Sequence, residues 1–241
     1  MTPDKLIAEI RDYCKANTNA ENVKKYGRFF KKDIKYNGYG LSAPLIYVKI
    51  KELLKNKEIA LDIILQAADK LIVSEMYEEP TFALLLIDGR NKDFTKETFR
   101  TIETYFSRSI TNWAHADTLG MFILSKFFKQ GVINIDDFRS WLKSPNKYQR
   151  RCVPVTFIKH IKENRNSDFN LFFKFIEPLM TDKEREVHQG VGWFLREAWK
   201  IQPEITEKFL FSWKNISPRL IFQYAAEKMN KEKKELFKKT K

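Results

Sequence analysis

Residues 112–120, NWAHADTLG, place a tryptophan and an aspartate four positions apart, between two apolar stretches. In a helix this spacing puts Trp113 and Asp117 on one face. No Lys or Arg lies among residues 113–117 to pair the carboxylate. A packed aromatic ring beside a carboxylate at a helix start is one interpretation. The other is a site that requires a negative charge beside an aromatic wall, an arrangement that suits a cationic group.

Two other stretches could take part in chemistry. YQRRC, residues 148–152, sets two arginines side by side, and GVGWFLREAW, residues 190–199, sets Gly190 and Gly192 before Trp193. Glycine inside a helix costs about 1 kcal/mol relative to alanine. Two of them therefore indicate that another helix or a ligand backbone comes close to this segment.

The spacing of these stretches suggests that they occupy equivalent positions in consecutive repeats. Arg150 lies 37 residues after Trp113, and Trp193 lies 43 residues after Arg150. Both intervals approximate one helical repeat of about 40 residues. Equivalent helices of consecutive repeats would then present Trp113, Asp117, Arg150 and Trp193 along one surface, a plausible groove for nucleic acid. Taken singly, each residue has a simpler explanation as part of the core, a helix cap or a solvated face.

Helix signals dominate the elements that must position these residues. Thr2 and Pro3 predict a cap and a first-turn proline, and residues 95–110 repeat an apolar stripe at helical spacing. Thr181 and Glu184 have the spacing of a capping box. Ser217 and Pro218 predict the start of another helix. Pro154, four residues after Arg150, is expected to kink the helix there.

We count roughly twelve short helices and no convincing series of alternating strands. Paired helices of this length predict an all-α fold, a HEAT-like helical-repeat solenoid (an α-α superhelix) with a concave basic face. One domain would cover residues 1–230, followed by a lysine-rich C-terminal tail over residues 231–241. An irregular helical bundle is the alternative fold.

Charge and cysteine content narrow the function classes. Lys and Arg number 44 against 31 Asp and Glu, a net charge of +13, which favours a polyanionic partner, nucleic acid before an anionic membrane surface. Cys14 and Cys152 lie far apart, so a zinc site is not expected. The N-terminus lacks the apolar core of a signal peptide and no apolar run could span a bilayer. We expect a cytoplasmic protein, monomeric and without a membrane partner.

Several segments resemble the AlkD-like DNA alkylation repair family. HQGVGWFLREAWKIQPE is similar to that family's late-repeat GW-x-LRE segment, and ITNWAHADTLG to its Trp-x3-Asp segment. KYQRRCVPV, YGLSAPLIYVKIKELLK and SPRLIFQYAAEKM resemble further segments in the same order. The likeness runs over roughly residues 5–230.

The resemblance implies an array of HEAT-like repeats that hydrolyses the N-glycosidic bond of cationic N3- or N7-alkylated purines in duplex DNA. It implies no metal and no organic cofactor, and a base that stays in the duplex. By motif, Asp117 would be the catalytic carboxylate, and Trp113 and Trp193 would flank the deoxyribose. Arg150 would bind the DNA backbone, with Arg151 as the second choice in this register.

This chemistry is physically coherent. The alkylated purine is already a cationic leaving group, so no dedicated general acid is needed. The sugar develops oxocarbenium character, which a carboxylate and indole faces stabilise. Two other functions stay open. One is a non-enzymatic HEAT-repeat protein that binds bent or branched DNA, and the other is a protein-protein scaffold.

Overall fold

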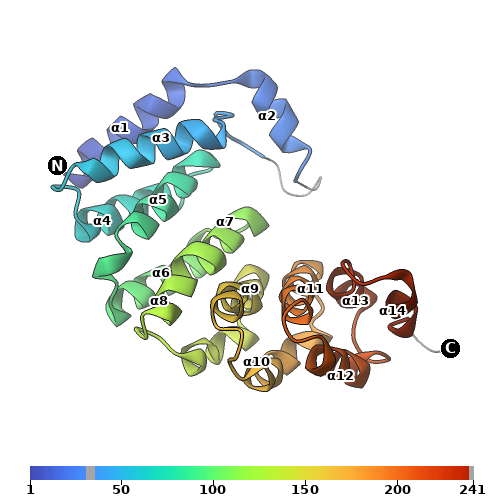
Figure 1. Ribbon diagram of the computed structural model, residues 1–241. Coiled ribbons are helices and arrows are strands. Elements are labelled where there is room, and N and C mark those ends of the chain that lie inside the picture. Colours follow the sequence, from blue (N-terminus) through green and yellow to red (C-terminus); the bar gives the residue numbers. More distant parts are fainter. Residues whose placement is uncertain (31–35, 239–241) are drawn as a thin grey trace. The chain divides into compact units, whose positions relative to one another are not determined.

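The computed structural model describes residues 1–30 and 36–238, and within these ranges the chain is helical with no strand (Figure 1). The predicted all-α fold is therefore confirmed, with fourteen α-helices in the described ranges where the sequence suggested about twelve. The chain divides into two units, Met1–His115 and Ala116–Lys241. A single repeat domain with a concave basic face over residues 1–230 stays a prediction.

The first unit is built from helices that pack side by side around an aliphatic and aromatic core (Figure 1). They are α1 (Pro3–Ala16), α2 (Ala20–Gly27), α3 (Ala43–Lys55), α4 (Leu61–Leu71), α5 (Glu78–Gly89), the 3₁₀ turn η1 (Asn91–Asp93) and α6 (Lys96–Arg108).

Helix α1 shows how directly the sequence specifies this unit. The Thr2 hydroxyl accepts a hydrogen bond from the Lys5 backbone N–H at 3.3 Å, and Pro3 occupies the first turn, as predicted. The buried stripe runs through Leu6, Ile7 and Ile10 and ends at Cys14. Local spacing alone therefore determines where α1 begins and which face it buries.

Helix α7 (Trp113–Thr118) lies at the junction of the two units. It continues into a π-helical segment η2 (Leu119–Leu124) and then α8 (Ser125–Lys129). The remaining elements of the second unit are η3 (Ile135–Phe138), η4 (Ser140–Lys143), α9 (Lys147–Glu163), α10 (Phe169–Ile176), η5 (Glu177–Thr181), α11 (Arg185–Trp199), α12 (Pro203–Trp213), α13 (Arg219–Ala225) and α14 (Lys231–Leu236).

Helix α11 is packed between α9 and α13. A Cβ atom added at Gly190 would lie 2.9 Å from Arg151 Cγ, and one added at Gly192 would lie 2.7 Å from the Ile221 carbonyl oxygen. Both glycines thus permit a neighbouring helix to approach closely, as the sequence predicted. Pro154 lies inside α9, yet the helix runs through it from Lys147 to Glu163.

Two predicted helix starts are wrong by a few residues. Thr181 and Glu184 do not form a capping box, because Thr181 ends the 3₁₀ segment η5 and α11 begins only at Arg185. The Asp182 carboxylate accepts the Glu184 backbone N–H at 2.8 Å. In α13 the residue before the first turn is Pro218, and Ser217 is fully buried behind it.

The predicted lysine-rich tail is folded as far as the description extends. It forms α14, and Phe237 directly after it is buried and packs on Phe211 with ring centroids 4.7 Å apart. Arg219 also donates to the Phe237 carbonyl oxygen at 2.9 Å. The Phe237 ring, the Arg219 hydrogen bond and an ion pair between Lys233 and Glu207 therefore hold this basic segment against the rest of the second unit.

Candidate functional site

Trp113, the first residue of α7, presents a partly open aromatic surface. Its side chain is 39% exposed. Within the first unit, Phe30 stacks on it with centroids 6.1 Å apart and an interplanar angle of 28°. Tyr36 in turn stacks on Phe30 at 5.4 Å. The aromatic wall that the sequence suggested is thus built from rings distant in sequence, which leave the indole half open.

His115 anchors the beginning of the same helix. Its Nε2–H donates to the Tyr77 carbonyl oxygen at 3.1 Å, and its Nδ1 accepts from the Asn112 amide at 2.8 Å. The Asn112 side-chain oxygen accepts the His115 backbone N–H at 2.9 Å, which caps α7. Burial lowers the pKa of His115 to about 4, so the ring is neutral near pH 7. Sequence reasoning missed this residue, whose burial depends on tertiary packing.

Asp117 does not carry the unpaired charge that the sequence suggested. Arg151 on α9 donates to it side-on, from Nε to Oδ1 at 2.8 Å and from Nη2 to Oδ2 at 2.8 Å. The Asp117 side chain is 17% exposed and that of Arg151 is 7% exposed. The expectation of an unpaired acid is therefore corrected: the acid has a cationic partner that lies 34 residues away in sequence. A bidentate pair of this kind fixes the carboxylate in one orientation.

The partner arginine is itself held from two sides. Its third hydrogen bond runs from Nη1 to the Glu186 carbonyl oxygen at 2.7 Å, in the first turn of α11. The side chain of Arg151 crosses α11 at Gly190, where no Cβ obstructs it. One residue along α9, the Cys152 thiol donates to the Ala116 carbonyl oxygen at 2.9 Å. The segment around Asp117 is therefore tied to α9 at two successive residues.

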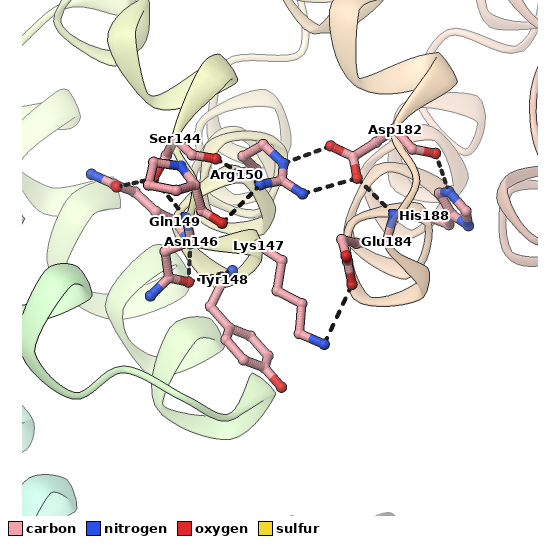
Figure 2. Close-up of polar contacts among 10 residues, drawn as sticks. Ser144, Asn146, Lys147, Tyr148, Gln149, Arg150, Asp182, Glu184 and His188 are labelled. Atoms are coloured by element: carbon pink, nitrogen blue, oxygen red, sulfur yellow. Dashed lines mark hydrogen bonds and ion pairs between the residues drawn. The ribbon is translucent and has the colours of Figure 1, made fainter. Parts of the chain in front are cut away.

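Arg150 points to a different partner. Its Nε and Nη2 donate to Asp182 Oδ2 and Oδ1 at 2.6 and 3.2 Å (Figure 2). Its Nη1 donates to the carbonyl oxygens of Ser144 and Pro145 at 2.6 and 3.3 Å. The side chain is 14% exposed. In this structure Arg150 is engaged inside the second unit, and its expected contact with the DNA backbone stays a prediction.

Trp193 lies on α11, three residues after Gly190, and is half-buried. It belongs to the second unit, whereas Trp113 belongs to the first. The second unit thus brings Asp117 and Arg151 together and places Trp193 on the helix that Arg151 crosses. The expectation that the two indoles flank one sugar stays a prediction.

The described residues, 1–30 and 36–238, contain no group of three or more His, Cys, Asp or Glu side chains arranged to hold a metal ion. No helix in them is long and apolar enough to cross a bilayer.

Similar structures support the fold. A predicted DNA alkylation repair enzyme from Enterococcus faecalis superposes with a TM-score of 0.74 at 18% identity, over 89% of this chain and 98% of its own. AlkD2 from Streptococcus mutans has a TM-score of 0.59 at 22% identity, over 86% and 99% of the two chains. The protein smu.31 from Streptococcus mutans UA159 has a TM-score of 0.59 at 23% identity, over 86% and 100%.

No curated protein matches the sequence of this chain. A profile of the family described as DNA alkylation repair enzyme matches residues 10–229, nearly the whole chain. The match includes α7, α9 and α11, the three helices that carry the candidate site residues. The chain therefore belongs to the DNA alkylation repair enzyme family.

Proposed function

We propose that this protein is a DNA glycosylase that hydrolyses the N-glycosidic bond of cationic N3- or N7-alkylated purines in duplex DNA, without flipping the base. The observation that carries the proposal is the Asp117 carboxylate, held side-on by Arg151 and still 17% exposed. It lies within the family match and one helical turn after a half-open tryptophan.

In the proposed reaction the purine leaves without being protonated by the protein, because alkylation has already made it a cation. The bond between C1′ and the purine nitrogen breaks, and its electron pair neutralises the cationic base. The sugar develops oxocarbenium character, and a water molecule adds to C1′ and releases a proton. Asp117 would stabilise the positive sugar and orient the water. Trp113 and Trp193 would offer their ring faces to the same charge. No metal or organic cofactor is required for these steps.

Arg151 fits this scheme as the residue that orients the carboxylate. Both Asp117 oxygens accept from it, so rotation about the last side-chain bond is blocked. Each oxygen retains a further lone pair that a water molecule or the sugar can approach. Of the two adjacent arginines, Arg151 is therefore the one joined directly to the proposed catalytic acid.

The same ion pair supports a second candidate function. A carboxylate already paired with a buried guanidinium stabilises a new cation less than an isolated carboxylate does. A structural pair of this kind is what a non-enzymatic DNA-binding member would also contain. In that case the protein would bind bent or branched DNA and release no base.

Base release from methylated duplex DNA, followed by chromatography, tests the two functions. The unmutated protein is expected to release 7-methylguanine or 3-methyladenine. Asp117→Asn keeps the shape and removes the charge, so it should slow release about 10²–10³-fold while duplex binding persists. Asp69→Asn, which removes another acid paired with an arginine, Arg108, is the matched control and should release base normally. Absence of release by the unmutated protein would overturn the proposal.

A further inference from the structure

The N-terminal ends of α9 and α11 are joined by a second arginine–aspartate pair, Arg150 with Asp182 (Figure 2). The side chain of Asp182 is 8% exposed, so this pair is nearly as enclosed as Arg151 with Asp117. Two consecutive arginines of α9 therefore reach in different directions. One contacts the segment before α11, and the other contacts the proposed catalytic acid.

Each partner also organises the turn to which it belongs. Arg150 donates to the Ser144 and Pro145 carbonyl oxygens, which form the turn that leads into α9. Asp182 Oδ1 accepts the Glu184 backbone N–H at 2.8 Å, and its carbonyl oxygen accepts from His188 Nε2 at 2.6 Å. The pair thus couples the two turns from which α9 and α11 begin.

The position of these turns determines the surroundings of Arg151. Its Nη1 bonds to the Glu186 carbonyl oxygen and its side chain lies against Gly190, both on the first two turns of α11. A displacement of the start of α11 would move both contacts. The Asp117 carboxylate follows, because both its oxygens bond to the same guanidinium.

We propose that Arg150 and Asp182 form a clamp that sets the separation of α9 and α11 and so positions Arg151 and Asp117 for base release. Arg150 is in this view a positioning residue and not a contact to DNA. The expected effect on base release rests on the proposed glycosylase function. The structural role of the clamp, which is to set the separation of α9 and α11, does not depend on that function.

The charges around Arg150 favour its pairing with Asp182 over a contact with a DNA phosphate. To reach a phosphate, Arg150 would have to give up Asp182 and two backbone carbonyls. It would leave a carboxylate that is 8% exposed without its cation, which is costly. Lys147 pairs with Glu184 at 3.4 Å (Figure 2) and with Glu186 at 3.1 Å, so its charge is already engaged by two other carboxylates.

The decisive variants are Arg150→Gln, Asp182→Asn and the two together. If Arg150 and Asp182 form the clamp, each single variant should lower the single-turnover rate of base release about tenfold or more, because the reacting groups are displaced. The dissociation constant for duplex DNA and its salt dependence should not change. The double variant should release base no more slowly than either single variant, because each single substitution already breaks the same ion pair between Arg150 and Asp182. Arg139→Gln, which breaks the exposed pair with Asp136, is the matched control.

A phosphate contact predicts the opposite pattern. Arg150→Gln would then weaken duplex binding and reduce the salt slope by about one. Asp182→Asn would free the cation and tighten binding. Either result overturns the clamp.

A measurement without DNA separates this proposal from the glycosylase function. Both single variants should speed amide hydrogen exchange over residues 184–190 to the same extent, with the overall helix content kept. Unchanged exchange in that segment would overturn the clamp even if the unmutated protein releases base. Faster exchange with no base release by any form would support the clamp and overturn the function.

Discussion

The two units of this protein differ most in how they carry charge. Residues 1–115 contain 19 Lys and Arg against 16 Asp and Glu, a net charge of +3. Residues 116–241 contain 25 against 15, a net charge of +10. The excess that favours a polyanionic partner therefore resides chiefly in the second unit, which also contains Asp117, Arg150, Arg151 and Trp193.

Both units bury charged side chains, which are Lys49, Glu78 and Glu79 in the first and Arg151, Glu186 and Glu197 in the second, but the surroundings of the candidate site residues differ. Next to Trp113, the first unit buries a neutral imidazole, His115, among the rings of Tyr77 and its neighbours. In the second unit, the buried Glu197 pairs with Lys162, Arg196 and Lys200. Burial acts to raise the pKa of Glu197, but hydrogen bonds from Lys162 and Lys200 outweigh it and hold that pKa at about 2. At the candidate site residues, the first unit thus provides the stacked ring of Trp113, and the second provides the Asp117–Arg151 ion pair.

The largest effect expected from this difference is an acid sensitivity in the first unit. The pKa of His115 is lowered from 6.5 to about 4 by burial, so the unfolded chain binds the proton more readily between these values. Stability from the neutral ring is complete above pH 6.5 and is lost as the pH falls toward 4, by about 3 kcal/mol in all. Urea unfolding at pH 7 and pH 5 should show about 2 kcal/mol of this loss, and His115→Asn should flatten it. An equally steep decline in that variant would contradict the assignment.

A smaller effect compares the two tryptophans. Trp113→Ala in the first unit and Trp193→Ala in the second should each slow base release about thirtyfold, because a desolvated cation–π contact contributes about 2 kcal/mol. Trp199→Ala, which removes an indole that donates to Glu207 at 2.7 Å, is the control on the same helix as Trp193. If only one of the two slows release, the paired indole arrangement is wrong and that unit alone supplies the aromatic contact.

The smallest effect concerns salt. Arg185 on α11 and Arg100 on α6 are both exposed, one in each unit. Arg185→Gln is expected to reduce the slope of log affinity against log salt by about one, whereas Arg100→Gln should leave it unchanged. Fluorescence anisotropy with a short duplex at several salt concentrations measures both. Equal slopes in the two variants would mean that DNA does not prefer the second unit.

Local signals in the sequence predicted much of the helical framework. The cap at Thr2 and the stripe of α1 were found because both depend on residues within four positions of one another. The same holds for α6, where Thr95 caps a helix that buries Phe99, Ile102 and Phe106. The predicted start of α11 is wrong because the turn before the helix is held by Asp182, which accepts the Glu184 backbone N–H and also pairs with Arg150 on α9.

Sequence by itself thus determined the all-helical class, the family and the residue types of the candidate site. Only the tertiary structure decided which arginine meets Asp117. Neighbouring side chains on a helix point about 100° apart, so a shift of one residue in the packing of α9 would place Arg150 opposite Asp117 and Gln149 opposite Asp182. Helix formation depends on contacts a few residues apart, but the pairing of charges 34 residues apart depends on how three helices pack, which no local pattern encodes.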